Sequence, residues 1–347
     1  MIVEDLLLEK CLSKGKRGDV FLTSKKNSSI KYITKRVEKN EKTSNDILNE
    51  KEILKELNND KIIKILEIKE TNKYYFILKE YCNGGSLNNC LEQYFEKYEK
   101  SFSEKIIQHL MKQIIECIYY IHGMNIMHRD INLNNILIVF ETEEDQKSNN
   151  LLKAKIKLND FCYATKISKE LHKTIIGSPF HFEPGILNTL NNTGNLMDFQ
   201  GYDEKADIWA LGTICYQLIT GKTLFKGSNI KELMTVFSTG KYWLPLSCSH
   251  EIVDFIKNML QFDTNDRLNA EELLKHPFLV NNVNEFHKID INKEKENIDT
   301  RGLNISFFKI KNEDNIKNIN DFNNDNNFND ERIIKESNYD DYEVEEK

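Results

Sequence analysis

The chain has 347 residues, of which 39% are hydrophobic, and its formal net charge is −7. This size can bury a large core and suits one two-lobed domain or two small ones, while the acidic balance argues against nucleic acid or an anionic membrane as the main partner. Seven scattered cysteines without zinc-binding spacing, and the lack of a long uncharged apolar stretch, lead us to expect reduced thiols and a soluble cytoplasmic protein without a membrane span, with a nuclear location left open.

The first predicted element is a strand, a glycine turn and a second strand over residues 12–22. Gly15 and Gly18 lie in this turn, between Ser13 and Val20. Backbone amides approach phosphates closely only where no Cβ intervenes, so the turn suits a phosphate-binding loop. A plain β-hairpin is the commoner explanation of two such glycines, and the turn alone does not decide between the two.

A third strand and a helix follow. The strand is predicted over residues 31–37 and contains Lys35, which only its register distinguishes from the many solvated lysines. The helix is predicted to begin between Thr43 and Asn45, where capping residues cluster. Glu50 lies on the apolar face of this helix, where a carboxylate needs a cation unless it sits at the edge of the apolar stripe.

Two more strands, at residues 62–68 and 74–78, lead to a connecting segment that contains Glu80 and Cys82. Ser101 and Glu104 then have the spacing of a capping box, which predicts the start of a long amphipathic helix. Further along, residues 207–218 are apolar all round, and this pattern predicts a fully buried helix.

Residues 125–138 combine an apolar stretch, a polar turn and a second apolar stretch, which predicts two short strands flanking a loop. The polar turn contains Asp130 and Asn135, a carboxylate and an amide at close spacing. After Leu137, an acidic, Asn-rich insertion at about residues 141–153 has no periodicity and is predicted to be disordered.

Taken in order, these motifs resemble those of eukaryotic protein kinases. The loop with Asp130 and Asn135 resembles H-R-D-x-x-x-x-N, and Asp160 begins a segment that corresponds to D-F-G. The turn with Gly15 and Gly18 resembles G-x-G-x-x-G-x-V. Independent chance matches would not preserve both order and spacing, so the resemblance is specific.

The resemblance implies an α+β, protein-kinase-like two-lobed fold over residues 8–280. The small β-rich N-lobe is expected at about 8–81, and the larger, mainly helical C-lobe at about 84–280. The implied activity is that of a protein serine/threonine kinase, which transfers the γ-phosphoryl group of ATP to Ser or Thr of protein substrates with Mg²⁺ as cofactor.

The resemblance also implies roles for individual residues. Asp130 would accept the proton of the substrate hydroxyl, and Lys35, paired with Glu50, would position the phosphates. Asn135 and Asp160 would hold the metal. The expected ATP-binding residues are Leu12, Ser13, Gly15, Gly18, Val20, Lys35, Glu80, Cys82 and Leu137.

The residues that depart from the kinase pattern are Ser13, Ile33, Lys79, Asn132, Cys162 and Gly185. Lys79 is a charged residue behind the expected adenine site, and Asn132 replaces a lysine that touches the γ-phosphate. Gly185 replaces a glutamate expected to pair with Arg267, unless Glu183 substitutes for it. These departures keep open a pseudokinase that binds nucleotide or acts as a scaffold, although the complete catalytic set favours an active enzyme.

Thr174 aligns with the usual activating phosphorylation site and would pair with Arg129 when phosphorylated, the alternative being an ordinary exposed hydroxyl. Residues 81–85 and 177–179 look most like ULK-type autophagy kinases, and kinases of the calcium/calmodulin group look similar. From residue 281 to 347 the chain is acidic and Asn-rich, which predicts a disordered tail that could bind a regulatory protein.

Overall fold

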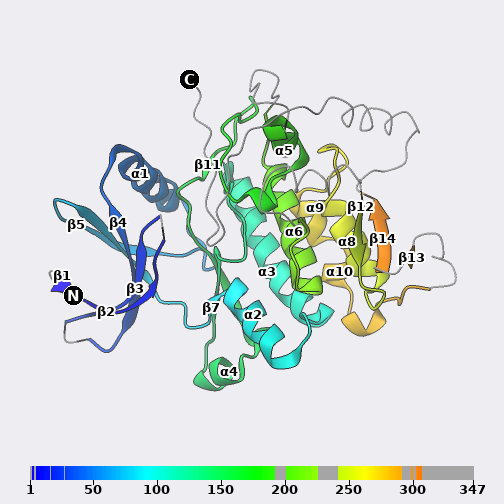
Figure 1. Cartoon of the computed structure of the whole chain (residues 1–347), viewed down its shortest axis with the longest axis horizontal. Helices are drawn as coiled ribbons and strands as arrows, with labels where there is room; N and C mark the ends of the chain where they lie inside the picture. Colours follow the sequence, from blue (N-terminus) through cyan, green and yellow to red (C-terminus); the bar gives the residue numbers. More distant parts are fainter. Residues whose placement is uncertain are drawn as a thin grey trace, which may run out of the picture.

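The computed structural model describes residues 2–3, 5–15, 17–26, 28–191, 201–225, 241–290, 298–299 and 302–306 of the chain. These residues form two lobes (Figure 1). A cleft lies between the lobes. The smaller lobe, blue and on the left, is a sheet with one helix, and the larger lobe on the right is mainly helical. This arrangement confirms the two-lobed α+β fold predicted from the sequence.

The small lobe is built on an antiparallel sheet with the strand order β1-β2-β3-β4-β6-β5. The strands are β1 (Ile2–Val3), β2 (Leu6–Ser13), β3 (Asp19–Lys25), β4 (Lys31–Glu38), β5 (Ile65–Glu70) and β6 (Tyr74–Glu80). The predicted glycine turn connects β2 to β3. Lys35 lies in the middle of β4, opposite Val20 of β3 and Ile77 of β6.

Helix α1 (Glu41–Glu56) begins slightly earlier than predicted, because Asn40 and Thr43 form a capping box. The Thr43 N–H donates to Asn40 Oδ1 (2.8 Å), and the Asn40 N–H donates to Thr43 Oγ1 (3.0 Å). Glu50 is buried on the same face as Ile47, as the sequence predicted. The helix therefore directs this carboxylate toward the sheet and the cleft.

The large lobe is organised around two long helices, α3 (Glu104–Gly123) and α6 (Lys205–Thr220), whose side chains contribute to the main hydrophobic core. Trp209 and Leu211 of α6 are fully buried, which confirms the predicted buried helix. The lobe also contains α2 (Leu87–Tyr98), α5 (Pro184–Asn191), α8 (His250–Met259), α9 (Ala270–Leu274) and α10 (Pro277–Val280). Its short strands near the cleft are β7 (Gly85–Ser86), β8 (Ile126–Met127), β9 (Ile136–Val139), β10 (Lys155–Leu158) and β11 (Thr165–Lys166).

The capping box predicted at Ser101 and Glu104 is wrong. Ser103 is the N-cap residue of α3, and its side chain makes no capping hydrogen bond. The Ser101 hydroxyl donates to the carbonyl oxygen of Ile219 in α6, while Glu104 accepts hydrogen bonds from the N–H and the hydroxyl of Ser249, the N-cap of α8. Ser101 therefore makes a tertiary contact with α6, and Glu104 connects α3 to α8. The spacing of the two residues in the sequence does not reveal these contacts.

The insertion at residues 141–153 is ordered, so the prediction of disorder is wrong there. It contains helix α4 (Glu143–Ser148), within which Asp145 is buried. Gln146 donates a hydrogen bond to the backbone carbonyl of Asn83 (2.9 Å), which ties the insertion to the segment between the lobes. Its composition is polar, but local capping and this tertiary contact suffice to order it.

Part of the predicted disordered tail is also ordered. β14 (Gly302–Ser306) pairs with β12 (Lys241–Leu244) and β13 (Ile298–Asp299) in an antiparallel sheet on the large lobe. Leu303 and Ile305 are buried, with 4% and 8% of their surface exposed, because alternate residues of a strand share one face. The prediction of disorder is wrong for β13 and β14 and for residues 281–290, which include the 3-10 helix Val283–Glu285 and the buried Ile289. Residues 291–297, 300–301 and 307–347 lie outside the described residues.

A buried ion pair joins the N-terminus of α5 to the loop before α9. Arg267 is fully buried, and its Nη1 lies 2.7 Å from Glu183 Oε2. Burial raises the pKa of Glu183, and Arg267 opposes this effect. Glu183 thus takes the place of the glutamate that the sequence lacks at Gly185.

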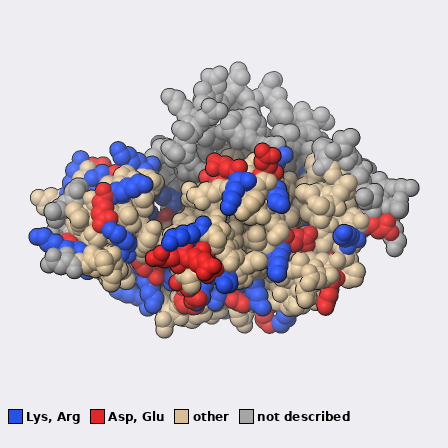
Figure 2. Space-filling model, turned by 90° about the horizontal axis from the view of Figure 1, so that it is seen from below, with Lys and Arg blue, Asp and Glu red and all other residues tan. Residues whose placement is uncertain are grey.

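The surface mixes charges of both signs. On the face shown in Figure 2, Lys and Arg gather over the small lobe at the left, and Asp and Glu lie among basic residues along the large lobe. This view shows no extended basic face of the kind that binds nucleic acid, and the expectation about nucleic acid stays a prediction. Among the residues that the structure describes, we find no helix with the length and apolar character of a membrane span.

Replacing Ile305 by alanine should lower the free energy of unfolding by about 2 kcal/mol, because a buried aliphatic side chain leaves a cavity when truncated. Asn304→Ala, on the opposite face of β14, is the matched control and should have a smaller effect. Urea unfolding of the full chain, followed by tryptophan fluorescence, measures both variants. Equal stability of Ile305→Ala and wild type would show that β14 does not belong to the folded lobe in solution.

Glu183→Ala should lower the free energy of unfolding by about 3–5 kcal/mol, because Arg267 would stay buried without a counter-charge. Adding Gly185→Glu should recover part of this loss, since a Cβ at Gly185 would lie 3.6 Å from the present position of Glu183 Oε1. Chemical unfolding of the single and double variants measures the difference, with Gly185→Glu alone as control. A double variant no more stable than Glu183→Ala would show that a carboxylate at position 185 cannot pair with Arg267.

Candidate active site

A cleft of about 640 Å³ lies between the two lobes. Its walls come from the glycine turn, β4 and α1 of the small lobe and from the loops that follow β8 and β10 in the large lobe. The predicted site residues that meet on these walls are Ser13, Gly15, Lys35, Glu50, Asp130, Asn135 and Asp160. The structure therefore brings the predicted catalytic, phosphate-binding and metal-binding positions together.

The predicted ATP-binding residues that do not line this cleft are Leu12, Gly18, Val20, Glu80, Cys82 and Leu137. Leu12 is 47% exposed near the end of β2. Cys82 is buried between the lobes, and its carbonyl accepts a hydrogen bond from the Gly85 N–H (3.2 Å). The cleft walls thus correspond to the phosphate end of the expected nucleotide site, and the adenine end stays a prediction.

The two glycines of the turn have different structural requirements. Gly18 has a φ of +114°, and a Cβ there would lie 2.4 Å from the carbonyl oxygen of Arg36, so the turn itself requires glycine. At Gly15 a Cβ would meet only the carbonyl oxygen of Gly18, at 3.9 Å. Because Gly15 lines the cleft without being needed for the turn, its missing side chain keeps the backbone accessible to a phosphate.

Asp207 of α6 holds the loop that carries Asp130. Its carboxylate accepts hydrogen bonds from the backbone N–H of His128 (2.8 Å) and of Arg129 (2.9 Å), which lie between β8 and β9. Burial alone would raise the pKa of Asp207, but these bonds and one from His122 outweigh burial and lower it. The ionised carboxylate fixes the loop backbone on the buried helix.

The Asp130 carboxylate is surrounded by hydrogen-bond donors. Asn135 Nδ2 donates to Asp130 Oδ2 (2.8 Å), and Asn132 Nδ2 donates to Asp130 Oδ1 (3.0 Å). Asn132 Oδ1 in turn accepts hydrogen bonds from the N–H groups of Asn134 and Asn135. Asn132 is thus a structural part of the loop and brings no positive charge to the cleft.

Asp160 faces the same space from the loop after β10. Its φ is +67°, a conformation that is uncommon for a residue with a side chain and is often found at functional sites. Burial would raise the pKa of Asp160, but Lys35, Lys79 and Arg17 outweigh burial and hold the pKa well below its usual range. The carboxylate is therefore ionised.

The oxygens of Asp160 and Asn135 fit a hard divalent cation. Asp160 Oδ1 is buried and has no hydrogen-bond partner among the described residues. The amide nitrogen of Asn135 donates hydrogen bonds to Asp130, so the amide oxygen of Asn135 can serve as a second metal ligand. In the described part of the chain no group of three or more His, Cys, Asp or Glu side chains could hold a metal. Mg²⁺ often takes only one or two protein oxygens and completes its shell with waters and substrate phosphates, so this pair suits it.

Glu50 pairs with Lys79 and not with Lys35, so the predicted Lys35–Glu50 pair is wrong in this structure. Lys79 Nζ lies 2.7 Å from Glu50 Oε1 and 3.1 Å from Asn159 Oδ1, and the Lys79 and Glu50 side chains are only 5% and 2% exposed. Lys35 Nζ lies 3.3 Å from Asp160 Oδ2 instead. Lys79 reaches Glu50 because it lies on β6, the strand that pairs with β4.

The Lys79–Glu50 pair connects three elements. Glu50 Oε1 also accepts a hydrogen bond from the N–H of Phe161 (3.4 Å), next to Asp160. Helix α1, strand β6 and the Asp160 loop therefore meet at one carboxylate. Lys35 lies on the phosphate side of the cleft. Burial alone would lower the pKa of Lys35, but the charge of Asp160 outweighs burial and raises it.

Arg17 is the main site residue that the sequence reasoning missed. It lies in the glycine turn, and its Nη1 is 3.2 Å from Asp130 Oδ2 and 3.5 Å from Asp160 Oδ2. The guanidinium carbon lies 4.5 Å from the ring centroid of Tyr163. Two signals in the sequence pointed to it: a basic residue in a phosphate-binding turn, and the missing lysine at Asn132.

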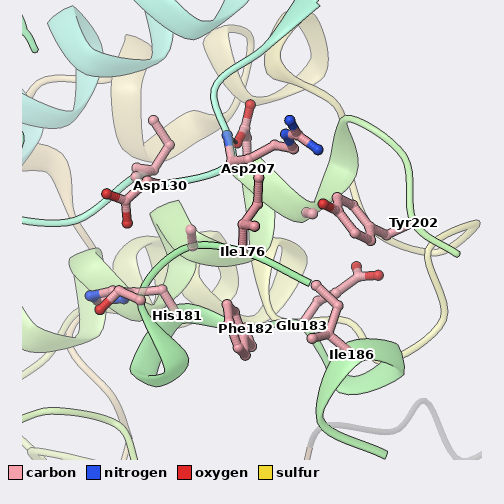
Figure 3. Close-up of a pocket in the computed structure, with 13 residues that line it drawn as sticks. Asp130, Ile176, His181, Phe182, Glu183, Ile186, Tyr202 and Asp207 are labelled. Carbon is pink, nitrogen blue, oxygen red and sulfur yellow. Dashed lines mark hydrogen bonds between the residues drawn. The ribbon is translucent and has the colours of Figure 1, made fainter. Parts of the chain in front are cut away.

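A small cavity of about 20 Å³ lies beside Asp130, beneath the segment that leads to α5 (Figure 3). Figure 3 shows Asp130 and Asp207 on one side of Ile176, with His181 and Phe182 on the other. This volume suits about one water molecule and no larger ligand. Burial lowers the pKa of His181 to about 4, so this histidine is neutral at pH 7 and acts as a packed side chain.

Thr174 is exposed, and its carbonyl oxygen accepts a hydrogen bond from the Tyr202 hydroxyl (2.6 Å). Burial raises the pKa of Tyr202, while Arg129 opposes this effect through its charge and a hydrogen bond. Tyr202 therefore contacts both Thr174 and Arg129. The residue predicted to bind phosphorylated Thr174 thus lies in its neighbourhood.

Lys79→Met should lower the free energy of unfolding by about 3 kcal/mol, because Glu50 would be left buried without its cation. Adding Glu50→Gln should recover most of the loss, since it removes the unpaired charge. Lys64→Met, at an exposed position just before β5, is the matched control. Chemical unfolding measures the stability of all three variants. A Lys79→Met variant as stable as wild type would show that Lys35 can replace Lys79 as the ion-pair partner of Glu50.

Comparison with known proteins agrees with this geometry. A model of the protein kinase domain matches residues 7–279. Calcium-dependent protein kinase 4 of Plasmodium falciparum (isolate 3D7) is 31% identical over 312 residues, which cover 87% of this chain and 53% of that protein. Myosin light chain kinase A of Dictyostelium discoideum is 31% identical over 295 residues, covering 83% of this chain and 92% of that protein.

A third relative, serine/threonine-protein kinase PLK4 of Drosophila virilis, is 25% identical over 80% of this chain and 33% of its own length. The chain spans about half the length of the calcium-dependent kinases that it matches. The subfamily stays a prediction. The matched domain extends over both lobes and contains every residue of the cleft described above, so the chain belongs to the protein kinase family.

Proposed function

We propose that the chain is an ATP-dependent protein kinase that transfers the γ-phosphoryl group to Ser or Thr hydroxyls of protein substrates. The observation that carries this proposal is the pairing of Asp130 and Asp160 across one cleft, each within 3.5 Å of the same Arg17 nitrogen. One carboxylate accepts hydrogen bonds from amides, and the other has a buried oxygen without a hydrogen-bond partner among the described residues. This is the division of roles between base and metal ligand that phosphoryl transfer requires.

Asp130 acts as the base in this mechanism. The hydroxyl oxygen of the substrate attacks the γ-phosphorus, its proton passes to the Asp130 carboxylate, and the bond from phosphorus to the β–γ bridging oxygen breaks to release ADP. Asn132 and Asn135 orient the carboxylate, and Asp207 fixes the backbone that carries it. These contacts hold the base in place before the substrate arrives, which reduces the entropic cost of the reaction.

Lys35 binds the phosphates from the small lobe, and Glu50 acts indirectly. Through Lys79 and the N–H of Phe161, Glu50 positions the Asp160 segment instead of positioning Lys35. Asp160 and Asn135 would hold Mg²⁺, which would neutralise charge on the phosphates. The remaining predicted ATP-binding positions, at Leu12, Val20, Glu80, Cys82 and Leu137, complete the proposed adenine end of the site.

Three further assignments belong to this proposal. Phosphorylation of Thr174 would place a dianion near Arg129, with Tyr202 between them, and would order the segment before α5. A regulatory protein would bind the acidic tail beyond β14. We expect the chain to act in the cytoplasm, as its composition suggests.

Asp130→Ala should lower the rate of phosphoryl transfer by about 10²–10⁴-fold, the usual contribution of a general base. The measurement is transfer of labelled γ-phosphate to a generic Ser/Thr protein and to the chain itself, with Mg²⁺ and with a chelator. Chelation should abolish the transfer. Glu96→Ala, which removes an exposed carboxylate from α2, is the control and should leave the rate unchanged.

The same experiment decides between this function and the pseudokinase alternative. Transfer that depends on Asp130 supports a working kinase in which Lys79 and Asn132 are tolerated. If the folded chain transfers no phosphate at high concentration with Thr174 phosphorylated, a nucleotide-binding or scaffolding role replaces the proposal.

A further inference from the structure

The cleft lacks a cation at one position and has an extra cation at another. Asn132 stands where the kinase resemblance leads us to expect a lysine on the γ-phosphate, and its side chain is committed to hydrogen bonds with Asp130 and the loop backbone. Arg17 meanwhile extends from the glycine turn to the same carboxylate. The two residues contact different oxygens of Asp130, with Asn132 on Oδ1 and Arg17 on Oδ2.

We propose that Arg17 is a catalytic residue that supplies the transition-state charge missing at position 132. The inference rests on the proposed kinase function. The phosphoryl group must pass between the base, Asp130, and the metal-binding carboxylate, Asp160, and Arg17 Nη1 lies within 3.5 Å of both. The guanidinium is therefore already located along the path of the transferred group.

The chemistry of Arg17 suits this task. A guanidinium stays charged at any working pH and presents planar N–H donors that match phosphate oxygens. Burial disfavours its charged form, but Asp130 and Asp160 outweigh burial and raise its pKa further. Its stacking on Tyr163, with 4.5 Å from the guanidinium carbon to the ring centroid, restrains the group over the cleft.

The contacts also explain how the site changes when it is loaded. In the structure, Arg17 lies beside Asp130 and Lys35 lies beside Asp160. With the nucleotide bound, Asp160 would hold the metal and Asp130 would face the substrate hydroxyl, and Arg17 would exchange its carboxylate partners for oxygens of the γ-phosphate. As the bond to the bridging oxygen breaks and the bond to the hydroxyl oxygen forms, Arg17 stabilises the charge on the moving group.

The test compares Arg17→Gln, Arg17→Gln with Asn132→Lys, and Lys14→Gln, which removes an exposed charge from the same turn. Arg17→Gln should lower kcat by about 10²-fold, the loss seen when one donor to developing charge is removed. The affinity for ADP, measured by calorimetry, should stay unchanged, and that for a non-hydrolysable ATP analogue should fall. Adding Asn132→Lys should raise the kcat of the Arg17→Gln variant about tenfold, because the new ammonium would lie beside the same carboxylate.

The outcomes separate this inference from the proposed function. An active wild type whose Arg17→Gln variant keeps or exceeds the wild-type kcat would show that Arg17 blocks the cleft or is a bystander, and would overturn the inference alone. Equal loss of ADP and ATP-analogue affinity, or no rescue by Asn132→Lys, would show a structural role for the turn and would also overturn it. A wild type that transfers no phosphate would overturn both proposals.

Discussion

The cleft depends on one electrostatic constraint: three carboxylates share a partly buried space, and each needs a cation beside it. Asp130, Asp160 and Glu50 are all buried, and a buried charged group is costly unless a partner of opposite charge lies beside it. Arg17, Lys35 and Lys79 supply these cations, each from a different part of the small lobe. The glycine turn, strand β4, helix α1 and strand β6 are thereby held in position relative to the large lobe.

Three of the departures from the kinase pattern have a compensating neighbour. The glutamate missing at Gly185 is replaced by Glu183, which reaches the same Arg267. The lysine missing at Asn132 has a counterpart in Arg17, and the unexpected Lys79 is neutralised by Glu50. Each of these positions therefore has a side chain of the needed or opposite charge within contact distance, and no charge at them is left buried without a partner in the described residues.

The sequence predicted what depends on local pattern. Strand register placed Lys35 in the sheet, helical spacing placed Glu50 on the buried face of α1, and the loop motif located Asp130 and Asn135. It could not predict pairing between long side chains, because Lys35 and Lys79 lie on adjacent strands and both can reach Glu50. Polar composition likewise predicted disorder for residues 141–153 and β14, where tertiary contacts such as the burial of Leu303 impose order.

The exchange of partners at Glu50 changes what controls helix α1. In the arrangement expected from the family resemblance, the lysine that binds the phosphates also holds the helix, so nucleotide contact and helix position are linked. Here Lys79 of strand β6 holds Glu50, and both side chains are buried. A buried ion pair contributes little net stability but strongly resists separation of its partners. The contact that holds helix α1 at the cleft is therefore made by Lys79, while Lys35 contacts Asp160 and makes no ion pair with the helix among the described residues.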